Sequence, residues 1–153
     1  LRAEVLLDAM TQVTGIEPEF KAMPPDSSAK QLWTVRSESL FLDTFGRPDP
    51  NQSPPCERTT DSTVVQSLHL MNSEDIFRDI GSEQGKTRAL ANSELSATEV
   101  SQELYRRIFG REPTADETTL ATELLAAEGA IRQQVIEDLT WAMVNSAEFV
   151  FQN

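Results

Sequence analysis

The chain has 153 residues, of which 39% are hydrophobic, which is long enough for one buried core and short for two. Aspartate and glutamate number 25 against 13 lysines and arginines, giving a net charge of -12. A surface this acidic repels phosphate backbones and anionic lipids, which argues against nucleic-acid binding and membrane binding. No apolar run reaches the length of a membrane span, no signal peptide is visible, and the chain starts at Leu1, so we expect a piece of a longer protein.

The first predicted element is a helix over residues 1–15. It is followed by an irregular arm over residues 16–60, because this stretch holds seven of the eight prolines and shows no sustained period. The arm is either a functional loop or a wrap across the helices, and residues 29–35 fit a short extended piece within it. The helix is predicted from apolar residues on one face and from a stop signal after them: Leu6, Ala9, Met10 and Val13, then Gly15 and Pro18.

The words Phe-Gly-Arg-Pro and Phe-Gly-Arg-Glu-Pro occur at residues 45–48 and 109–113. We interpret both as helix ends. Glycine takes the left-handed position there, arginine lies near the negative pole of the helix dipole, and proline prevents continuation. The two stretches therefore indicate two similar helix ends rather than a functional repeat.

Residues 61–153 are predicted to form a helical bundle, with helix starts marked by capping boxes. These pair Thr63 with Gln66, Ser96 with Glu99, and Thr114 with Glu117. The predicted core-facing stripes are Val64, Val65, Leu68 and Met71; Val100, Leu104 and Ile108; Leu120, Leu124 and Ala127; and Ile131, Val135, Leu139 and Ala142. The chain is thus predicted to be an all-α single domain, 1–153, of about six helices.

Three side-chain placements complete the prediction for the bundle. Glu103 and Arg107 are expected to pair on one helix at i, i+4. Trp141 is expected to pack against the proline-rich arm, because a lone exposed indole is uncommon. Phe149 and Phe151 are expected to be buried anchors.

Residues 81–87, Gly-Ser-Glu-Gln-Gly-Lys-Thr, resemble a phosphate-binding loop at first sight. The motif needs four residues between its glycines, and three stand between Gly81 and Gly85. A helical stretch precedes it where a strand is required. We therefore predict a turn between two helices.

Cys56 and His69 are the single cysteine and the single histidine of the chain. The acidic neighbours Glu57 and Asp61 disfavour a reactive thiolate unless Arg58 dominates. A zinc site would need two carboxylates in addition to these two ligands. We expect structural burial of both side chains, with no metal and no cofactor in this chain.

Two carboxylate pairs are possible acids and bases, and nothing in their spacing demands that role. They are Asp43 with Glu57, and Asp138 with Glu148. Arg47 and Arg58 are equally well interpreted as salt-bridge partners.

Five stretches, in order along nearly the whole chain, carry a resemblance to a known family: LRAEVLLDAM with QVTG, FLDTFGRP, CERTTDSTVVQSLHLMNS, ELYRRIFGREPTADE and DLTWAMVNSAEFVF. They resemble a planctomycete-specific domain of unknown function found C-terminal in exported proteins that often carry a cytochrome c-like domain. The resemblance implies an envelope or secreted parent with haem attached elsewhere, since Cys-x-x-Cys-His is missing here. Members often read Cys-x-Cys-Glu-Arg where this chain has Pro54 in place of the first cysteine.

The polar residues of that motif that this chain keeps are Glu57, Arg58, Gln66, His69 and Asn72. They suit a hydrogen-bonded network that holds the proline-rich turn against a helix. We take the candidate functional cluster to be Asp43, Arg47, Cys56, Glu57, Arg58, Gln66, His69 and Asn72.

The first functional hypothesis is a non-catalytic interaction or scaffolding module of a larger exported protein, in the periplasm, the cell envelope or outside the cell. Its partners would be other domains of the same parent or envelope proteins. One alternative is a hydrolase or redox site completed by other domains of the parent, with Asp43, Arg47, Glu57, Arg58 and His69 around one cleft. Another alternative is a carbohydrate-binding module that uses Trp33.

Overall fold

The computed structural model describes residues 3–18, 24, 27–31 and 73–150. Within these residues the chain forms seven α-helices and one short 3-10 helix, and no strand. The elements are α1 (Ala3–Thr14), η1 (Ala29–Gln31), α4 (Glu74–Ile80), α5 (Lys86–Ala91), α6 (Ala97–Phe109), α7 (Ala115–Ala126), α8 (Arg132–Val144) and α9 (Ala147–Val150). The prediction of an all-α fold is confirmed.

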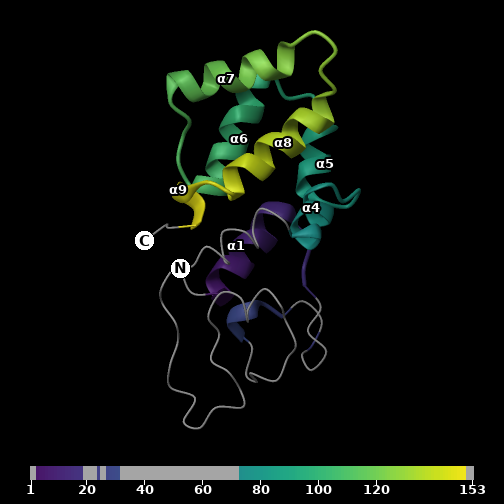
Figure 1. Cartoon of the computed structure of the whole chain (residues 1–153), viewed down its shortest axis with the longest axis vertical. Coiled ribbons are helices and arrows are strands. Elements are labelled where there is room, and N and C mark those ends of the chain that lie inside the picture. The colour runs from purple at the N-terminus through teal and green to yellow at the C-terminus, as the bar shows by residue number, and fades with distance from the viewer. Residues whose placement is uncertain (1–2, 19–23, 25–26, 32–72, 151–153) are drawn as a thin grey trace.

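The helices pack around α6 and α8 (Figure 1). α7 lies across one end of the bundle, and α1 lies on the side away from α7. α6 contacts α7, α8 and α9, while α5 packs on α8 and α1 reaches α5 and α6. The end of α6 and the start of α7 therefore lie close to α9, which is more than 20 residues away in the sequence.

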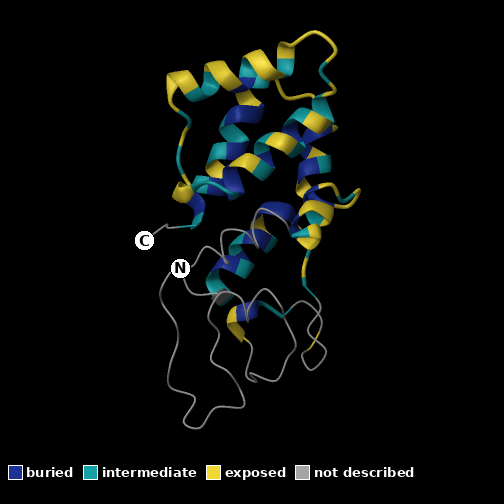
Figure 2. Ribbon diagram, in the orientation of Figure 1, coloured by how far each residue is buried: buried dark blue, intermediate teal, exposed yellow. Residues whose placement is uncertain are grey.

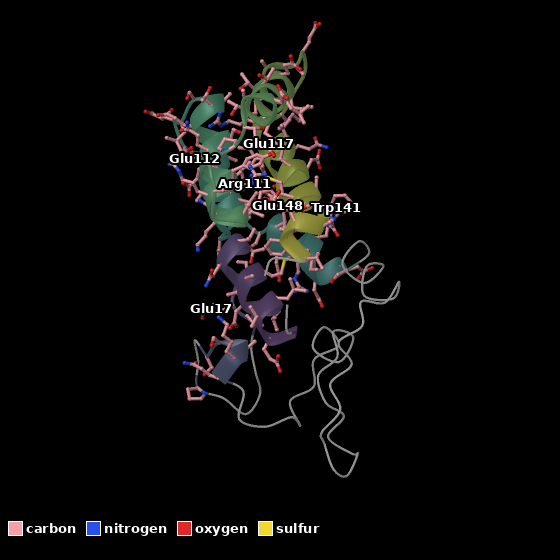
Figure 3. All side chains as sticks on the ribbon, turned by 90° about the vertical axis from the view of Figure 1, so that its left-hand side faces the viewer. Glu17, Arg111, Glu112, Glu117, Trp141 and Glu148 are labelled. Atoms are coloured by element: carbon pink, nitrogen blue, oxygen red, sulfur yellow. The ribbon has the colours of Figure 1, made fainter. Side chains whose placement is uncertain are left out.

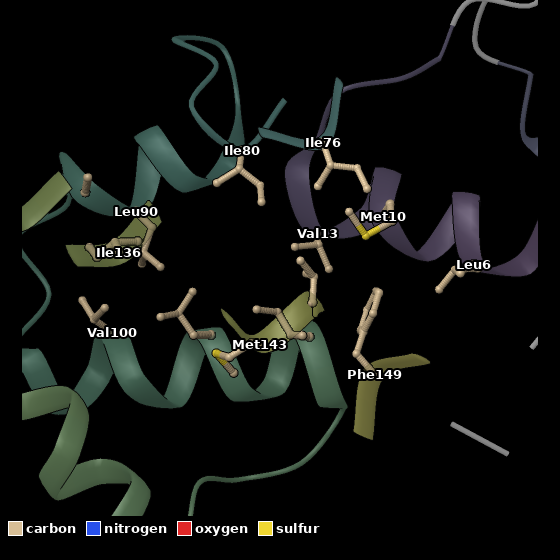
Figure 4. Packing of buried hydrophobic residues seen from close by; sticks show 14 residues of the cluster. Leu6, Met10, Val13, Ile76, Ile80, Leu90, Val100, Ile136, Met143 and Phe149 are labelled. Carbon is tan, nitrogen blue, oxygen red and sulfur yellow. The ribbon is translucent and has the colours of Figure 1, made fainter. Parts of the chain in front are cut away.

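One buried hydrophobic cluster joins six of these helices (Figure 4). Burial of a side chain such as Leu104 stabilises the fold by ~1.5–3 kcal/mol relative to leaving it exposed. α7 contributes no member of the cluster, so other contacts must hold it. The members are Leu6, Met10, Val13, Ile76, Ile80, Leu90, Ala91, Val100, Leu104, Ile108, Ile136, Met143, Val144 and Phe149.

The helix ends follow the sequence signals. Ser96 and Glu99 form a capping box at the start of α6, and Thr114 and Glu117 form one at the start of α7. Gly110 ends α6 in the left-handed conformation, at φ 69°, as the Phe-Gly-Arg interpretation predicts. The predicted ion pair between Arg107 and Glu103 is also present, at 2.6 Å between Arg107 Nη2 and Glu103 Oε1.

α1 confirms the first predicted helix, whose face buries Leu6, Met10 and Val13. It ends at Thr14, and Gly15 follows with φ 75°. The turn predicted at residues 81–87 does lie between α4 and α5, but it is shorter, because Lys86 and Thr87 already belong to α5. Phe149 is buried as expected.

The expectation of an extended piece is wrong for residues 29–31, which form η1. The Asp8 carboxylate explains this, because it accepts hydrogen bonds from Ala29 N (2.6 Å) and Lys30 N (3.3 Å). A carboxylate that accepts two consecutive backbone N–H groups favours a helical turn over an extended strand. Gln31 reinforces the turn, since its Oε1 accepts from Ser28 N at 3.1 Å.

The stripe predicted for α7 is wrong by one position. Leu120 and Leu124 are 55% and 41% exposed, and Ala121 is buried at 4%. Adjacent helix positions are about 100° apart, so α7 is rotated away from the orientation that its leucines predict. Figure 2 shows the result, a helix that is exposed along most of its length.

The rotation of α7 has a polar cause at its first turn. Glu117 binds Arg111, which fixes that face of the helix toward α6. Ala121 and Leu125 follow Glu117 at i+4 and i+8, on the same side of the helix. Ala121 is buried and Leu125 packs partly against the core.

α8 shows the same shift of one position, since its buried side chains are Ile136, Thr140, Met143 and Val144 and not Val135, Leu139 and Ala142. Here Arg132 is the polar anchor: it donates to Ala91 O (3.1 Å) and Leu95 O (2.7 Å). Ile136 and Thr140 follow at i+4 and i+8. Thr140 tolerates burial because its hydroxyl donates to Ile136 O at 2.7 Å.

Several predictions fall outside the described residues: the helix around Val64, the capping box at Thr63, most of the arm, and Phe151. The contact expected between Trp141 and the arm is likewise untested, and Trp141 itself packs partly against the core. None of the described helices is both long enough and apolar enough to cross a membrane.

Candidate functional site

The candidate functional cluster lies entirely outside the described residues, and Trp33 does too. It consists of Asp43, Arg47, Cys56, Glu57, Arg58, Gln66, His69 and Asn72. The roles assigned to these residues, and the pair of Asp43 with Glu57, therefore stay predictions.

The densest polar contact in the described part of the chain is built around Arg111, just after α6. Figure 3 shows its side chain between those of Glu117 on α7 and Glu148 on α9. Nη1 and Nη2 donate to Glu117 Oε2 (2.9 Å) and Oε1 (2.8 Å), while Nε and Nη2 donate to Glu148 Oε1 (2.6 Å) and Oε2 (2.9 Å). Nη1 also donates to the backbone oxygen of Glu112 at 3.0 Å. All five N–H donors of the guanidinium are thus engaged.

Aromatic rings complete the surroundings of Arg111. Its guanidinium carbon lies 5.1 Å from the ring centre of Tyr105 and 5.4 Å from that of Phe109, within the range of cation–π attraction. The two rings are tilted neighbours on α6. Arg111 thereby ties the ends of α6 and α9 to the start of α7.

The charges of this cluster shift the pKa of its members. The hydrogen bonds from Arg111 lower the pKa of Glu117 to about 2 and also lower the pKa of Glu148. The same carboxylates raise the pKa of Arg111. Burial raises the pKa of Tyr105, and the charge of Glu117 raises it further. Glu117 and Glu148 are therefore held as carboxylates bound to a cation.

A groove of about 280 Å³ lies beside this cluster, between α6, α7 and α8. Its lining is mostly apolar and includes Leu120 of α7 and Leu139 and Ala142 of α8, residues that the sequence patterns place in the core. The other lining residues are Ser101, Leu104, Tyr105, Phe109, Glu117, Ala121, Met143, Ser146 and Glu148.

Ser101 gives this groove one polar point. Its side chain is fully buried on α6, and its hydroxyl makes no hydrogen bond within the part of the chain that the structure describes. A buried polar group without a partner is uncommon in native structures, because its desolvation goes uncompensated. The hydroxyl lies beneath the apolar lining and has almost no accessible surface of its own.

A second groove, of about 330 Å³, lies between α4 and α8. Two apolar side chains on its walls are strongly exposed, Phe77 at 67% and Ile131 at 64%. Trp141 also lines it, together with polar residues of α8: Gln133, Gln134, Glu137 and Asp138. This lining places aromatic faces next to amide and carboxylate groups.

Glu148 is bound by Arg111, and no interaction between Glu148 and Asp138 is seen among the described residues. The described residues also contain no group of three or more metal-ligating side chains arranged to hold an ion.

The PSD1 family model, described as a protein of unknown function (DUF1553), matches residues 1–125. The chain belongs to the PSD1 family. The match runs from α1 through most of α7, so it includes Arg111, Glu117 and the α6–α7 side of the groove. No curated protein and no solved structure matches the chain significantly.

From the sequence, Arg111, Glu117 and Glu148 are each assigned a role other than the ion-pair cluster seen in the structure. Arg111 was interpreted as helix punctuation, and Glu117 as a capping residue, which it also is. The spacing between the two, six residues across a capped helix start, is a usable signal for an ion pair. Glu148 is 37 residues from Arg111, and no local pattern in this PSD1 chain connects them.

Proposed function

We propose that the chain is a non-catalytic interaction module. The observation that carries the proposal is the presence of large apolar side chains on the described surface, at Phe77, Leu120, Leu124 and Ile131, each more than 40% exposed. Two grooves lie next to these residues. Exposed apolar patches rimmed by polar residues are typical of surfaces that bind other proteins.

The polar chemistry favours the same proposal. Arg111, Glu117 and Glu148 saturate one another, and each pKa shift stabilises the charged form of its group. A general acid or base instead needs a pKa near the working pH. This cluster is suited to holding helices together rather than to moving protons.

The resemblance supports a finer proposal, in which the chain is the C-terminal part of a larger exported planctomycete protein that often carries a cytochrome c-like domain. On this proposal the partner is another domain of the same parent or a neighbouring protein of the envelope, and any haem is attached elsewhere in the parent. The chain itself would need no cofactor.

The proposal is tested by amide NMR spectra of the isotopically labelled chain, recorded alone and with the rest of its parent protein. We expect a contiguous set of amide shifts on one surface. An unchanged spectrum would contradict an interaction with the parent. Substrate turnover by the purified chain that is lost in His69→Ala or Cys56→Ala would instead favour the enzymatic alternative.

The groove between α4 and α8 favours carbohydrate binding as a second candidate function. Aromatic faces next to amide and carboxylate groups suit a sugar, which presents both C–H faces and hydroxyls. Phe77 and Trp141 would supply the faces, and Gln134 and Asp138 the hydrogen bonds. Binding would quench tryptophan fluorescence on titration with soluble oligosaccharides. The quenching should vanish in Trp141→Ala and persist in Trp33→Phe, and the reverse pattern would contradict this site.

A further inference from the structure

We propose that the groove between α6, α7 and α8 binds a basic amphipathic helix of another protein or domain. The inference rests on the proposed interaction function and names the partner chemistry. Its occupant would present large apolar side chains on one face, with lysines or arginines beside them.

The apolar lining of the groove comes from the residues of α7 and α8 that the sequence pattern places in the core but the structure leaves at its edge. Leu120 on α7 and Leu139 and Ala142 on α8 come from apolar stripes with helical spacing, yet all three line an open groove. Leu139 also packs partly against the core, whereas Leu120 is 55% exposed. Leu124 continues the apolar surface one turn beyond Leu120 and is 41% exposed. Packing a second apolar helix face against these residues would bury them.

Negative charge lies beside this apolar surface, on the outer face of α7. Asp116, Leu120, Glu123 and Leu124 lie at i, i+4, i+7 and i+8, so carboxylates and leucines share one face, and all four residues are exposed. Asp116 and Glu123 make no ion pair with any described residue. Residues 113–150 contain one cation, Arg132, which is engaged with backbone carbonyls. Basic side chains on the partner would complement these carboxylates.

The groove geometry favours a helix as the occupant. It runs between helices, and the described residues offer no strand to which an extended peptide could add. From Asp116 to Ala127 the exposed face of α7 spans about 17 Å at 1.5 Å per residue, which matches roughly three turns of a partner helix.

A second copy of this chain is a poor occupant. Self-association through this face would bring the Asp116 and Glu123 carboxylates of two molecules together, in a protein whose net charge is already -12.

The test is fluorescence anisotropy with a labelled synthetic peptide of about 18 residues, long enough to form a helix. It is built from leucine and lysine, with leucines at i, i+3, i+4 and i+7. We expect saturable binding that weakens as salt is raised. A peptide of the same composition, with its leucines spread around the helix, should bind at least about tenfold more weakly, and one with glutamate in place of lysine should not bind.

Matched variants of the chain place the binding. Leu120→Ser with Leu124→Ser should weaken binding by about tenfold or more, because both leucines would lie under the peptide. Ile131→Ser makes the same kind of change at a more exposed leucine-sized residue in the other groove and should leave binding within about twofold. Asp116→Asn with Glu123→Gln should reduce the salt dependence, whereas Glu94→Gln, in the exposed loop before α6, should not.

Three results would overturn the inference. The first is a peptide that does not bind saturably, and the second is a peptide that binds the double serine variant as well as it binds the parent chain. The third is a dimer, detected by sedimentation, that the double serine variant abolishes. That result would make a second copy of the chain the occupant of the groove. Amide shifts caused by the rest of the parent protein separate this inference from the proposed function. Shifts confined to other surfaces would leave the interaction module standing and remove the groove, and no shifts with any partner would remove both.

Discussion

α6 and α7 begin alike and end in different environments. Each starts with a capping box, and each carries apolar side chains at i, i+4 spacing. The α6 stripe is buried, with Val100 at 0% and Leu104 at 2%, whereas Leu120 and Leu124 of α7 are largely exposed. The comparison teaches that an apolar period predicts which residues are suited to burial, and that a polar anchor can decide which face is in fact buried.

The anchor on α7 is the bond between Glu117 and Arg111. It has two parallel N–H to oxygen contacts, a geometry with strong directional preference. Arg132 plays the corresponding part on α8 by binding two backbone carbonyls. Both anchors lie in the first turn of their helix, and each holds one face of that helix toward a neighbouring segment.

The largest expected effect is a difference in stability between variants of Leu104 and of Leu120. Leu104→Ala should lower the free energy of unfolding by about 2–5 kcal/mol, because it leaves a cavity in the core. Leu120→Ala should cost less than about 1 kcal/mol, since its side chain is mostly in solvent. Chemical denaturation of the two variants measures the difference. Equal costs would break the comparison between α6 and α7.

The next effect concerns the side chain that takes the buried place on α7. Ala121→Leu should cost about 1–3 kcal/mol, because the added atoms must fit between α6 and α7. Ala126→Leu, on the exposed end of the same helix, should change stability by less than about 0.5 kcal/mol. A stabilised Ala121→Leu variant, seen as a higher midpoint of denaturation, would mean that α7 can turn its leucine pattern inward.

Arg132 gives a smaller effect. Arg132→Met keeps much of the side-chain length and removes its hydrogen bonds to Ala91 O and Leu95 O. We expect a loss of about 1–2 kcal/mol, reduced from the full value of a charged hydrogen bond because the site is partly exposed. Gln134→Met, at an exposed position of the same helix, is the control and should leave the melting temperature unchanged. Matching temperatures for both variants would remove Arg132 as the anchor of α8.

The smallest effect depends on pH. The folded pKa of Glu117 is lowered to about 2 by Arg111, so its contribution is present above the unfolded pKa, near 4.3, and is lost as the pH falls toward 2. After allowance for solvent screening we expect about 1 kcal/mol. Glu117→Gln should lose this at pH 7 and show a flatter decline in acid, whereas Glu123→Gln should follow the parent chain. Parallel acid curves for the parent and Glu117→Gln would contradict the role of the pair.

The all-α fold, the α1 and α6 core faces and the caps at Ser96, Thr114 and Gly110 were predictable because local signals determine them. Sequence alone placed Val100, Leu104 and Ile108 correctly, since α6 has no competing anchor on another face. It placed Leu120 and Leu139 one position away from the buried residues, because an apolar pattern does not show the pairing of Arg111 with Glu117 or the contacts of Arg132 with the segment before α6. Thr140 is not in the predicted stripe, and it can be buried because its hydroxyl donates to Ile136 O within its own helix.

The candidate site was less accessible from the sequence. The stretch Phe109 to Pro113 is interpreted from the sequence as a helix end, and the structure confirms this. A role as a helix end explains each residue in the stretch, so the sequence gives no reason to assign Arg111 a second role. The contact with Glu148 spans 37 residues. The groove is lined by Leu120, which is 55% exposed, and by Leu139, which packs only partly against the core, and no apolar pattern in the sequence shows this.

The most direct test of the account is the solvent exposure of individual leucine methyl groups. It is measured by NMR as the broadening caused by a soluble paramagnetic probe. We predict strong broadening for Leu120 and Leu124, protection for Leu104, and protection of Leu120 and Leu124 once the leucine–lysine peptide is added. Methyl groups of Leu120 and Leu124 that are already protected in the chain alone would contradict both the rotation of α7 and the open groove.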